Sequence, residues 1–323
     1  MCISILSTAH PDYPFILLNN RDEFLNRPTA RAAFWDPPNS HILGGRDLHR
    51  EERGTWLGIT KQGRLANLTN FREEGVEISK DKSRGGIPKS YLTESQDSVD
   101  GYEQYVDHLI NETGIHDVGG FTLLFGKLRA AKDGKFPGLA IISNRTSSAI
   151  SLQRICTTTG ETHGLSNSHF GDLTWPKVVR GEQLLRQAII SNVSRKAAQA
   201  QFIESLFAIL SVSVIPPKGE DEDWMTYVRQ MRNSIMIPPV GGEAIERSST
   251  DGLRAAEGGS TPSHGEVRVG EGVYGTQKQT VVLVDREGGV TYVERTLFDA
   301  QGKPTEGGER DQRVTFQIEG WND

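Results

Sequence analysis

Pairs of strand-like segments joined by short turns lie at both ends of the 323-residue chain. The segments are rich in Ile, Leu, Val and Thr, and the turns between them contain Gly, Pro or Asp. The three predicted hairpins are residues 3–8 with 15–20, 55–60 with 64–69, and 279–285 with 290–296. Strands joined by such short turns run antiparallel. The chain is therefore expected to form antiparallel sheets, and not the alternating strand–helix units of a parallel sheet.

The middle of the chain has the periodicity of helices. Residues 176–191 and 196–210 carry apolar side chains on one face, and residues 223–233 form a shorter helical segment. Thr174 is the expected N-cap of the first of these helices. A further helix is expected at 99–109, and the remaining predicted strands are 121–126, 139–143, 149–152 and 314–318. Helices between groups of strands predict a layered α+β protein.

The composition restricts the kinds of partner that the protein is expected to bind and the cellular compartment in which it is expected to occur. The net charge of -6 and the mixed distribution of acidic and basic residues give no support for binding nucleic acid. Two cysteines, Cys2 and Cys156, exclude a disulfide framework and favour a reducing compartment. No basic residue precedes Arg21, and the apolar stretch 15–18 is too short for a signal peptide or a transmembrane helix. A cytoplasmic protein is therefore expected.

Cys2 directly follows the initiator methionine and leads straight into the first predicted strand. If Met1 is removed, this residue carries both a thiol and a free α-amine, and both groups titrate near neutrality in model peptides. One residue would then supply a nucleophile and a base. The alternative is that Cys2 is a small apolar residue at the start of a buried strand, because free cysteines are often buried.

The first hairpin places charged residues next to the start of the chain. If the turn is centred at residues 11–12, paired residues have numbers that sum to 23, and Arg21 lies opposite Cys2. A turn shifted by one residue would place Asp22 or Glu23 there instead. A carboxylate can orient an α-ammonium group, and a guanidinium can stabilise a thiolate or bind a substrate carboxylate. The alternative is an ordinary charged strand end in solvent.

Several short motifs occur along the chain in a characteristic order. They are Asn20-Arg21-Asp22-Glu23 followed by Phe24 and Arg27-Pro28, Gly44-Gly45-Arg46-Asp47, Gly54-Thr55-Trp56-Leu57-Gly58, Leu68-Thr69-Asn70-Phe71-Arg72, Gly164-Leu165-Ser166-Asn167-Ser168 and Trp175-Pro176-Lys177. This series resembles the NRDE family, known as transport and Golgi organization protein 2. The resemblance covers nearly the whole chain and implies a single domain over residues 1–323.

Within that domain, residues 238–272 consist mainly of Gly, Ser, Glu, Pro and Arg, with few large apolar residues. Such a segment cannot offset the entropy lost on packing, so a disordered insertion is expected there. The family resemblance also implies a cellular role. It implies a cytoplasmic protein, with the Golgi or mitochondria as further locations, that acts in protein secretion, Golgi organization, lipid metabolism and haem trafficking.

The NRDE family is in turn similar to the cysteine N-terminal-nucleophile hydrolases, such as bile salt hydrolase and penicillin V acylase. This similarity implies a four-layer αββα sandwich of antiparallel sheets, with Cys2 as nucleophile and Arg21 and Asp22 as its neighbours. It also implies Asn70 as an oxyanion-hole donor and Asn167 as a donor to the amine or the substrate. An amide supplies N–H donors without charge, as an oxyanion requires. Both asparagines are equally well explained as turn residues.

Two positions depart from the pattern of these families. Gln277, in the motif Tyr274-Gly275-Thr276-Gln277, stands where an arginine is expected, and a glutamine cannot supply that charge. This departure favours a protein that does not turn over a substrate. Asp22 directly follows Arg21, whereas the hydrolases place the aspartate farther along the chain, so the role of Asp22 stays open.

The sequence leaves two classes of function open. In the first, an amidohydrolase or thioesterase uses Cys2 to attack a small acyl substrate while the α-amine of Cys2 moves the proton. In the second, the protein carries haem or a lipid-like ligand such as acyl-CoA without turnover. The spacing of His163 and His169 matches no zinc motif, so no metal site and no resident cofactor are expected. Haem is expected only as a transported ligand, with one histidine as its axial ligand.

Overall fold

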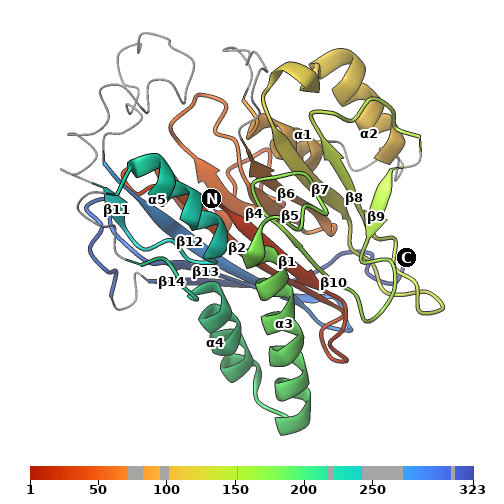
Figure 1. Cartoon of the computed structure of the whole chain (residues 1–323). Helices are drawn as coiled ribbons and strands as arrows, with labels where there is room; N and C mark the ends of the chain where they lie inside the picture. Colours follow the sequence, from red (N-terminus) through yellow and green to blue (C-terminus); the bar gives the residue numbers. More distant parts are fainter. Residues whose placement is uncertain (72–82, 95–101, 151, 217–221, 242–271, 307–309) are drawn as a thin grey trace.

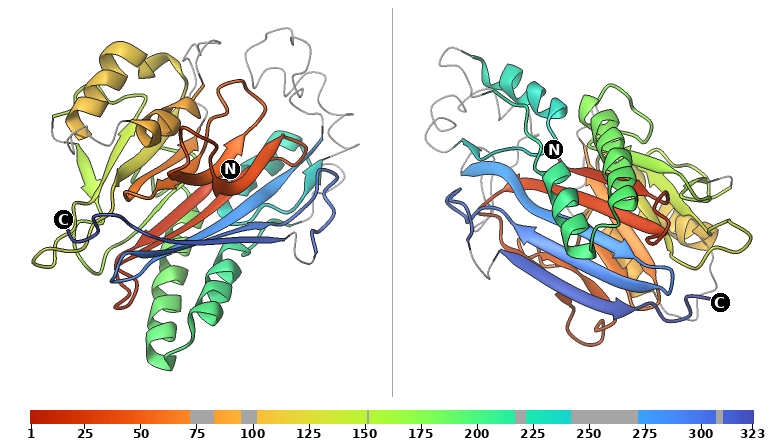
Figure 2. Two further views of the ribbon diagram at one scale, coloured as in Figure 1. Left: turned by 180° about the vertical axis from the view of Figure 1, so that it is seen from behind. Right: turned by 90° about the horizontal axis from the view of Figure 1, so that it is seen from below.

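The computed structural model describes residues 1–71, 83–94, 102–150, 152–216, 222–241, 272–306 and 310–323 (Figure 1). Two antiparallel sheets, each of seven strands, form the centre of this structure. Helices cover the outer face of each sheet, as the views in Figures 1 and 2 show. The layered α+β class predicted from the hairpins is confirmed.

The first sheet combines strands from both ends of the sequence. Its spatial order is β10 (Thr162–Leu165), β1 (Ile3–Ser7), β2 (Phe15–Phe24), β12 (Val273–Val284), β13 (Gly289–Thr296) and β14 (Asp311–Gln317), and β11 (Val240–Gly241) pairs with the start of β12. All of these pairs are antiparallel. The first strand of the chain therefore lies inside the sheet, with a neighbour on each side.

The second sheet follows the order of the sequence. Its strands are β3 (Thr29–Phe34), β4 (Ile42–Asp47), β5 (Leu57–Thr60), β6 (Arg64–Asn70), β7 (Phe121–Lys127), β8 (Leu139–Ser143) and β9 (Gln153–Ile155). Each strand pairs antiparallel with the next. The connection between β5 and β6 is short, which explains why this hairpin is visible in the sequence.

The helices form two groups. They are α1 (Gly86–Thr93), α2 (Tyr102–His108) with the π-helical turn Leu109–Thr113 and the 3-10 turn Ile115–Asp117, then α3 (Pro176–Arg195), α4 (Gln199–Leu210) and α5 (Trp224–Gln230) with the 3-10 turn Met231–Asn233. The first group lies over the second sheet, and α3 and α4 lie over the first sheet (Figure 1). Of the described helices, none is long and apolar enough to span a bilayer.

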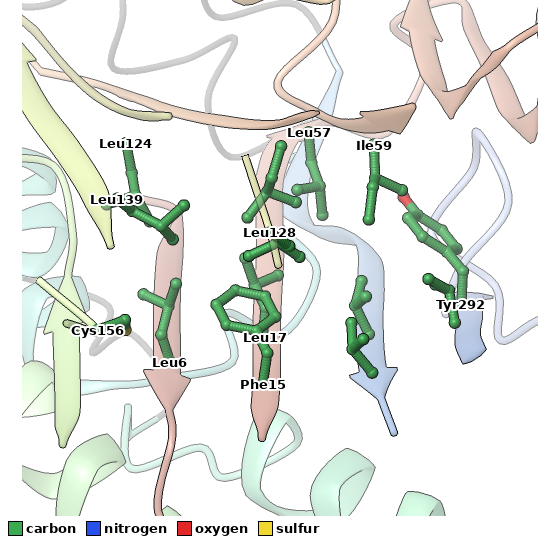
Figure 3. Close-up of a cluster of buried hydrophobic side chains, with 14 of the residues drawn as sticks. Leu6, Phe15, Leu17, Leu57, Ile59, Leu124, Leu128, Leu139, Cys156 and Tyr292 are labelled. Carbon is green, nitrogen blue, oxygen red and sulfur yellow. The ribbon is translucent and has the colours of Figure 1, made fainter. Parts of the chain in front are cut away.

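An apolar core fills the space between the two sheets. Leu6 and Leu17 come from the first sheet, and Leu57 and Ile59 come from the second. Figure 3 shows these side chains pointing toward one another. All four are completely buried. Burial of such side chains is the main favourable contribution to folding.

Two further cores lie outside the sheets. Ile5 of β1 packs with Phe202 of α4 on the outer face of the first sheet. Phe125 of β7 packs with Tyr91 of α1 on the outer face of the second sheet. Alternate residues of β1 thus face a helix layer and the opposite sheet, which accounts for the burial of all five of its residues. Three cores separate four layers, and the αββα arrangement is confirmed.

The three predicted hairpins are confirmed, including the register of the first. Ile3 lies opposite Asn20 and Ser4 lies opposite Asn19, so the numbers of paired residues sum to 23 as the turn at 11–12 predicted. Pairing of β5 with β6 and of β12 with β13 is also confirmed.

Other local predictions were wrong or incomplete. The strand expected at 149–152 instead begins at Gln153. Thr174 does not cap α3, because Trp175 is the N-cap residue and Pro176 begins the helix. No sequence pattern predicted β3, β4, β10 or α1. The insertion expected at 238–272 falls mostly outside the described residues, although its beginning forms β11.

Candidate active site

The sheet order places four strand ends around Cys2. Because β1 and β2 are antiparallel, the start of β1 lies beside the end of β2, and the start of β12 lies beyond it. On the other side, β10 ends next to the start of β1, where Leu165 lies opposite Ser4. Figure 1 shows the N-terminus among these strands, close to α5. Local hairpin geometry and long-range strand order together assemble this region.

Cys2 is half-buried, and its thiol lies against the backbone of β2. The Cys2 Sγ atom is 3.4 Å from the Asp22 amide nitrogen and 3.7 Å from the Asp22 carbonyl oxygen. The Cys2 carbonyl oxygen accepts a hydrogen bond of 2.6 Å from the Ser166 hydroxyl. Both sides of the chain start are therefore fixed by neighbouring strands, and the terminus is not splayed into solvent.

The carboxylate of Asp22 faces the terminal amine. Asp22 Oδ2 lies 3.7 Å from the Met1 ammonium nitrogen, which also donates a hydrogen bond to the Tyr274 hydroxyl. Asp22 Oδ1 accepts a 2.6 Å hydrogen bond from the Thr276 hydroxyl. The Asp22 side chain is almost completely buried. The structure thus places Asp22 where a carboxylate can orient an amine, which the sequence had left open.

Arg21 lies across from Cys2 in the confirmed register, and its guanidinium is held toward the second sheet. It stacks over the Trp56 ring at 4.5 Å and donates to the Gln277 Oε1 atom. It also lies 3.6 Å from the Asp47 carboxylate. These contacts compensate the charge of a side chain that is only 5% exposed. They fix the guanidinium close to the site but between the sheets.

Gln277 occupies an irregular position in β12. The register of β12 with β2 shifts between Thr276 and Lys278, so Gln277 lies in a bulge that redirects its side chain. Its Nε2 atom donates to the carbonyl oxygens of Leu25, at 3.3 Å, and of Arg27, at 3.2 Å. A neutral amide can thus bind the Arg21 guanidinium and two carbonyl groups at once. An arginine at this position would place a second cation against Arg21.

The two asparagines meet on the β10 side of Cys2. Asn167 donates from its Nδ2 atom to the backbone carbonyl of Asn70, and its Oδ1 atom is 3.4 Å from the Ser166 hydroxyl that binds Cys2. Asn167 is therefore linked through Ser166 to the backbone carbonyl of Cys2. Asn70 ends β6, its side chain is exposed, and it contacts the site through its carbonyl group. All five predicted site residues gather at this end of the molecule.

Lys177 is part of the site, although sequence reasoning assigned it no role. Its side chain is completely buried, and its ammonium group donates to the Met1 carbonyl oxygen and lies 5.6 Å from the centre of the Trp175 ring. Burial lowers the pKa of Lys177, and the nearby Asp22 and Cys2 partly oppose that change. The charge of a lysine in the first turn of a helix interacts unfavourably with the positive end of the helix dipole. That anomaly at the start of α3 was the available signal in the sequence.

Tyr274 lines the opposite side of the terminal amine. Burial, together with the neighbouring Asp22 and Cys2, raises the pKa of Tyr274 well above its ordinary value. The phenol therefore remains neutral over the physiological range and keeps its hydroxyl group as a hydrogen-bond partner.

A cavity of about 200 Å³ lies beside the site, on the β10 side. Ser166, which donates to the Cys2 carbonyl oxygen, and Trp175, whose ring lies 5.6 Å from the Lys177 ammonium group, line this cavity, so it is separated from Cys2 and Lys177 by single side chains. His163 and His169 line it as well. The His163 Nε2 atom lies 2.7 Å from Glu161, and the His169 ring packs against Phe71 at 4.7 Å. Across the described ranges, no group of three or more His, Cys, Asp or Glu side chains is arranged to hold a metal ion.

The second cysteine lies far from this region in the fold. Cys156 is buried in the core between the sheets, and burial raises the pKa of its thiol. It lines a cavity of only about 20 Å³, which is enough for a single water molecule. Cys156 is therefore a structural residue.

Solved structures of two hydrolases are similar to this chain in fold. One is the Caenorhabditis elegans ortholog of N-acylethanolamine-hydrolyzing acid amidase, with a TM-score of 0.40, 14% identity, and coverage of 68% of this chain and 88% of that chain. The other is a mutant of the conjugated bile acid hydrolase from Clostridium perfringens, with a TM-score of 0.38, 11% identity, and coverage of 100% and 98%.

Sequence comparison gives a closer relationship. The human Transport and Golgi organization protein 2 homolog is 30% identical over 291 residues, which cover 89% of this chain and 88% of the human protein. The sequence model of the Transport and Golgi organisation 2 family matches residues 1–299. That match includes every residue of the site described above. The chain belongs to the Transport and Golgi organisation 2 family.

Proposed function

We propose that, once Met1 is removed, this protein hydrolyses the amide or thioester bond of a small acyl substrate with Cys2 as its nucleophile. The observation that carries the proposal is the held chain start, where the Cys2 thiol lies against the backbone of Asp22 and the Met1 amine lies 3.7 Å from the buried Asp22 carboxylate. Chain termini are usually poorly ordered unless specific contacts hold them. Here three separate strands and α3 supply those contacts.

In the proposed first step, the α-amine of Cys2 takes the thiol proton while the Cys2 Sγ atom bonds to the acyl carbon. The tetrahedral intermediate then collapses, its amine or thiol leaving group departs with the proton from the α-amine, and an acyl thioester remains on Cys2. Water attacks that thioester and gives a proton to the α-amine. Collapse releases the carboxylic acid, and the thiol is restored.

The other residues of the site have supporting roles in this proposal. Asp22, held by Thr276, orients the amine so that its lone pair faces the thiol proton. Asn70 is the proposed amide donor to the developing oxyanion, a type of interaction that contributes about 2.7–4 kcal/mol in hydrolases. Asn167 is the proposed donor to the amine or the substrate. The cavity next to Ser166 and Trp175 is the proposed place for the substrate.

The test uses processed protein and 4-nitrophenyl butyrate as the acyl probe. We expect a burst of nitrophenolate equal to the enzyme concentration, followed by slower turnover. A Cys2→Ala variant should lose both phases, with a rate lower by at least about 10³-fold. Cys156→Ala is the matched control, because Cys156 is a buried thiol in the core, and it should retain the burst. Equal rates in the Cys2→Ala and wild-type proteins would refute the proposal.

A second function, binding an acyl or lipid-like ligand without turnover, is supported by Gln277. Gln277 accepts a hydrogen bond from the Arg21 guanidinium. Because Gln277 is neutral, it supplies no cation for a substrate at the position where an arginine was expected. In that case the probe should acylate Cys2 once, with a burst but no subsequent turnover. The same kinetic trace therefore separates the two functions.

At the cellular level we propose a cytoplasmic protein that acts in protein secretion and Golgi organisation, which the family name supports. A C-terminal fluorescent tag leaves the chain start free. Cells that lack the protein should secrete a reporter more slowly, and the tagged wild-type chain should restore secretion. Failure of the Cys2→Ala chain to restore it would connect the cellular role to the thiol.

A further inference from the structure

Lys177 has an unusual environment for a charged side chain. It is completely buried at the start of α3, and its ammonium group donates to the carbonyl oxygen of Met1. Fully buried lysines normally have an anionic partner, because an uncompensated buried charge is costly. The acceptor here is instead a neutral carbonyl group that belongs to the residue whose removal would create the terminal amine.

Removal of Met1 would change the surroundings of Lys177 in a definite way. The Met1 carbonyl carbon is bonded both to the oxygen that Lys177 holds and to the Cys2 nitrogen, so this nitrogen lies within about 5 Å of the Lys177 ammonium group. Cleavage of that bond removes the carbonyl acceptor and turns the Cys2 nitrogen into an amine. Two amines would then face each other in a buried site.

The charged and titratable groups around this pair come from three elements. Asp22 of β2 is the nearby carboxylate, Tyr274 of β12 is a neutral phenol, and the Cys2 thiol lies at the start of β1. Arg21 and Glu23 flank Asp22 on β2, and the Arg21 guanidinium is bound between the sheets. One buried carboxylate can balance one buried cation. Two protonated amines would leave an excess positive charge that the site cannot compensate.

We propose that Lys177 keeps the α-amine of Cys2 unprotonated near neutral pH, so that the amine can act as the base. Burial lowers the pKa of Lys177, whereas the nearby Asp22 and Cys2 oppose that change. Because lysine holds its proton more tightly than an α-amine in model peptides, and because these anionic neighbours favour its charged form, the single proton that the site tolerates stays on Lys177. Lys177 is therefore a positioning residue that acts through the amine and does not contact the substrate. This inference deepens the proposed hydrolase function and rests on removal of Met1, which that function also requires.

The inference makes a direct prediction for the processed wild-type protein. The α-amine of Cys2 can be followed by NMR from pH 5 to pH 10 in protein labelled at cysteine with ¹³C and ¹⁵N. We expect the midpoint of its titration to lie below the reference range of about 7.7 to 8.0. A midpoint within or above that range would overturn the inference, and this measurement needs no variant.

A variant then assigns the effect to Lys177. In processed Lys177→Met protein, which keeps a long apolar side chain, the midpoint should rise by about one pH unit or more. The matched control is Lys132→Met, which removes an exposed lysine and should leave the midpoint unchanged. An unchanged midpoint in folded Lys177→Met protein would mean that Lys177 only supports the fold. If that variant does not fold, the wild-type midpoint still decides.

Acylation by 4-nitrophenyl butyrate supplies the second readout. The acidic limb of the pH–rate profile of Lys177→Met should move to higher pH, so that its rate is about tenfold below wild type at pH 7 and converges with it at pH 9. A rate reduced equally at every pH would contradict the role assigned to Lys177. Absence of acylation in the wild-type protein would refute the proposed hydrolase, whereas the NMR titration would still test Lys177.

Discussion

Neighbouring side chains bind both backbone polar groups of Met1, its ammonium group and its carbonyl oxygen. The Met1 ammonium contacts Asp22 and Tyr274, and the Met1 carbonyl accepts from Lys177. One oxygen of the Asp22 carboxylate is buried and makes no hydrogen bond with any described residue, so its interaction with the amine is electrostatic. Such a group stabilises the fold only while a cation is near it. The same carboxylate can orient the amine of Cys2 once Met1 has been removed.

An Asp22→Asn substitution tests that role at the scale of a single residue. It preserves the shape of the side chain and removes its charge, so the amine should lose its fixed orientation. We expect acylation of Cys2 to slow by about 10²–10³-fold, as for loss of an orienting group in a catalytic site, while far-UV circular dichroism stays unchanged. Asp12→Asn, at an exposed aspartate of the first turn, is the control and should keep the wild-type rate. Wild-type acylation by Asp22→Asn would exclude the orienting role.

The site residues that could be placed from the sequence itself are those that a local hairpin brings together, whereas Asn70 and Asn167 were expected only through the family resemblance. Arg21 and Asp22 lie close to Cys2 because a single short turn fixes the pairing of β1 with β2. Lys177 and Tyr274 reach the site from α3 and β12, and no local pattern indicates how these elements pack. Their roles could therefore be assigned only from the structure.

At the scale of elements, a carboxylate organises the turn that leads into β10. Glu161 accepts hydrogen bonds of 2.7–2.8 Å from the backbone amides of Cys156, Thr157 and Thr158, and its Oε2 atom lies 2.7 Å from His163. Burial alone would raise the pKa of Glu161, but the hydrogen bonds from His163, Thr158 and Cys156 lower it to about 2. This turn fixes the start of the strand that carries Ser166 and Asn167 to the site.

A Glu161→Gln substitution should therefore destabilise the protein in a pH-dependent way. The pKa of Glu161 is about 2 in the folded protein, and its ordinary value, which applies to the unfolded chain, is 4.5. The carboxylate therefore contributes its full stabilisation above about pH 4.5. That contribution decreases as the pH falls from 4.5 toward 2. We expect the variant to lose about 1.5–3 kcal/mol in urea unfolding at pH 7, and less at pH 3.

The control for this prediction is Glu51→Gln, which changes an exposed glutamate. Its free energy of unfolding should match that of the wild type within about 0.5 kcal/mol at both pH values. A loss in Glu161→Gln that is the same at pH 7 and pH 3 would show that the charge of Glu161 is not the cause.

Elements with strong local patterns were predictable, and those shaped by their neighbours were not. The helices α3 and α4 have an apolar face, and β8 lies where the sequence predicts it. In contrast, β3 has the sequence Thr-Ala-Arg-Ala-Ala-Phe, which lacks an alternation of apolar and polar residues. In β4, a Cβ atom on Gly45 would lie 2.5 Å from the Trp56 ring. Glycine is required there by packing, and it conceals the strand in the sequence.

At the scale of the whole molecule, the core between the sheets connects the site to both ends of the chain. Leu6 and Leu17 lie on the two strands that carry Cys2 and Asp22, and Trp321, near the other end, belongs to the same core. The two sheets are therefore expected to unfold together as one domain.

A Leu17→Ala substitution tests this expectation. Leu17 is completely buried between the sheets, so the variant should lose about 2–5 kcal/mol of stability and still unfold in a single transition. Ile190→Ala, at a side chain of α3 that is 69% exposed, should change the stability by less than about 0.5 kcal/mol. Two separate transitions in calorimetry, only one of them shifted by Leu17→Ala, would show that the sheets are independent.

The antiparallel character of the sheets followed from the sequence, but the order of their strands did not. The site depends on β12, from the last part of the chain, lying beside β2, and on β10 lying beside β1. These pairings join segments far apart in the sequence, and the sequence contains no turn that specifies them. The four-layer arrangement could be expected only through the resemblance to a known family.

The central claim is that the functional chain begins with Cys2 and that its thiol accepts an acyl group. The most direct test is mass spectrometry of the N-terminal peptide from protein that is purified from its own cells and treated with 4-nitrophenyl butyrate. The reaction is quenched and the protein digested at acidic pH, which keeps the α-amine protonated and prevents transfer of the butyryl group from sulfur to nitrogen. We predict a peptide that begins at Cys2 and carries one butyryl group on sulfur. A peptide that retains Met1, or one that begins at Cys2 and remains unacylated, would contradict the claim.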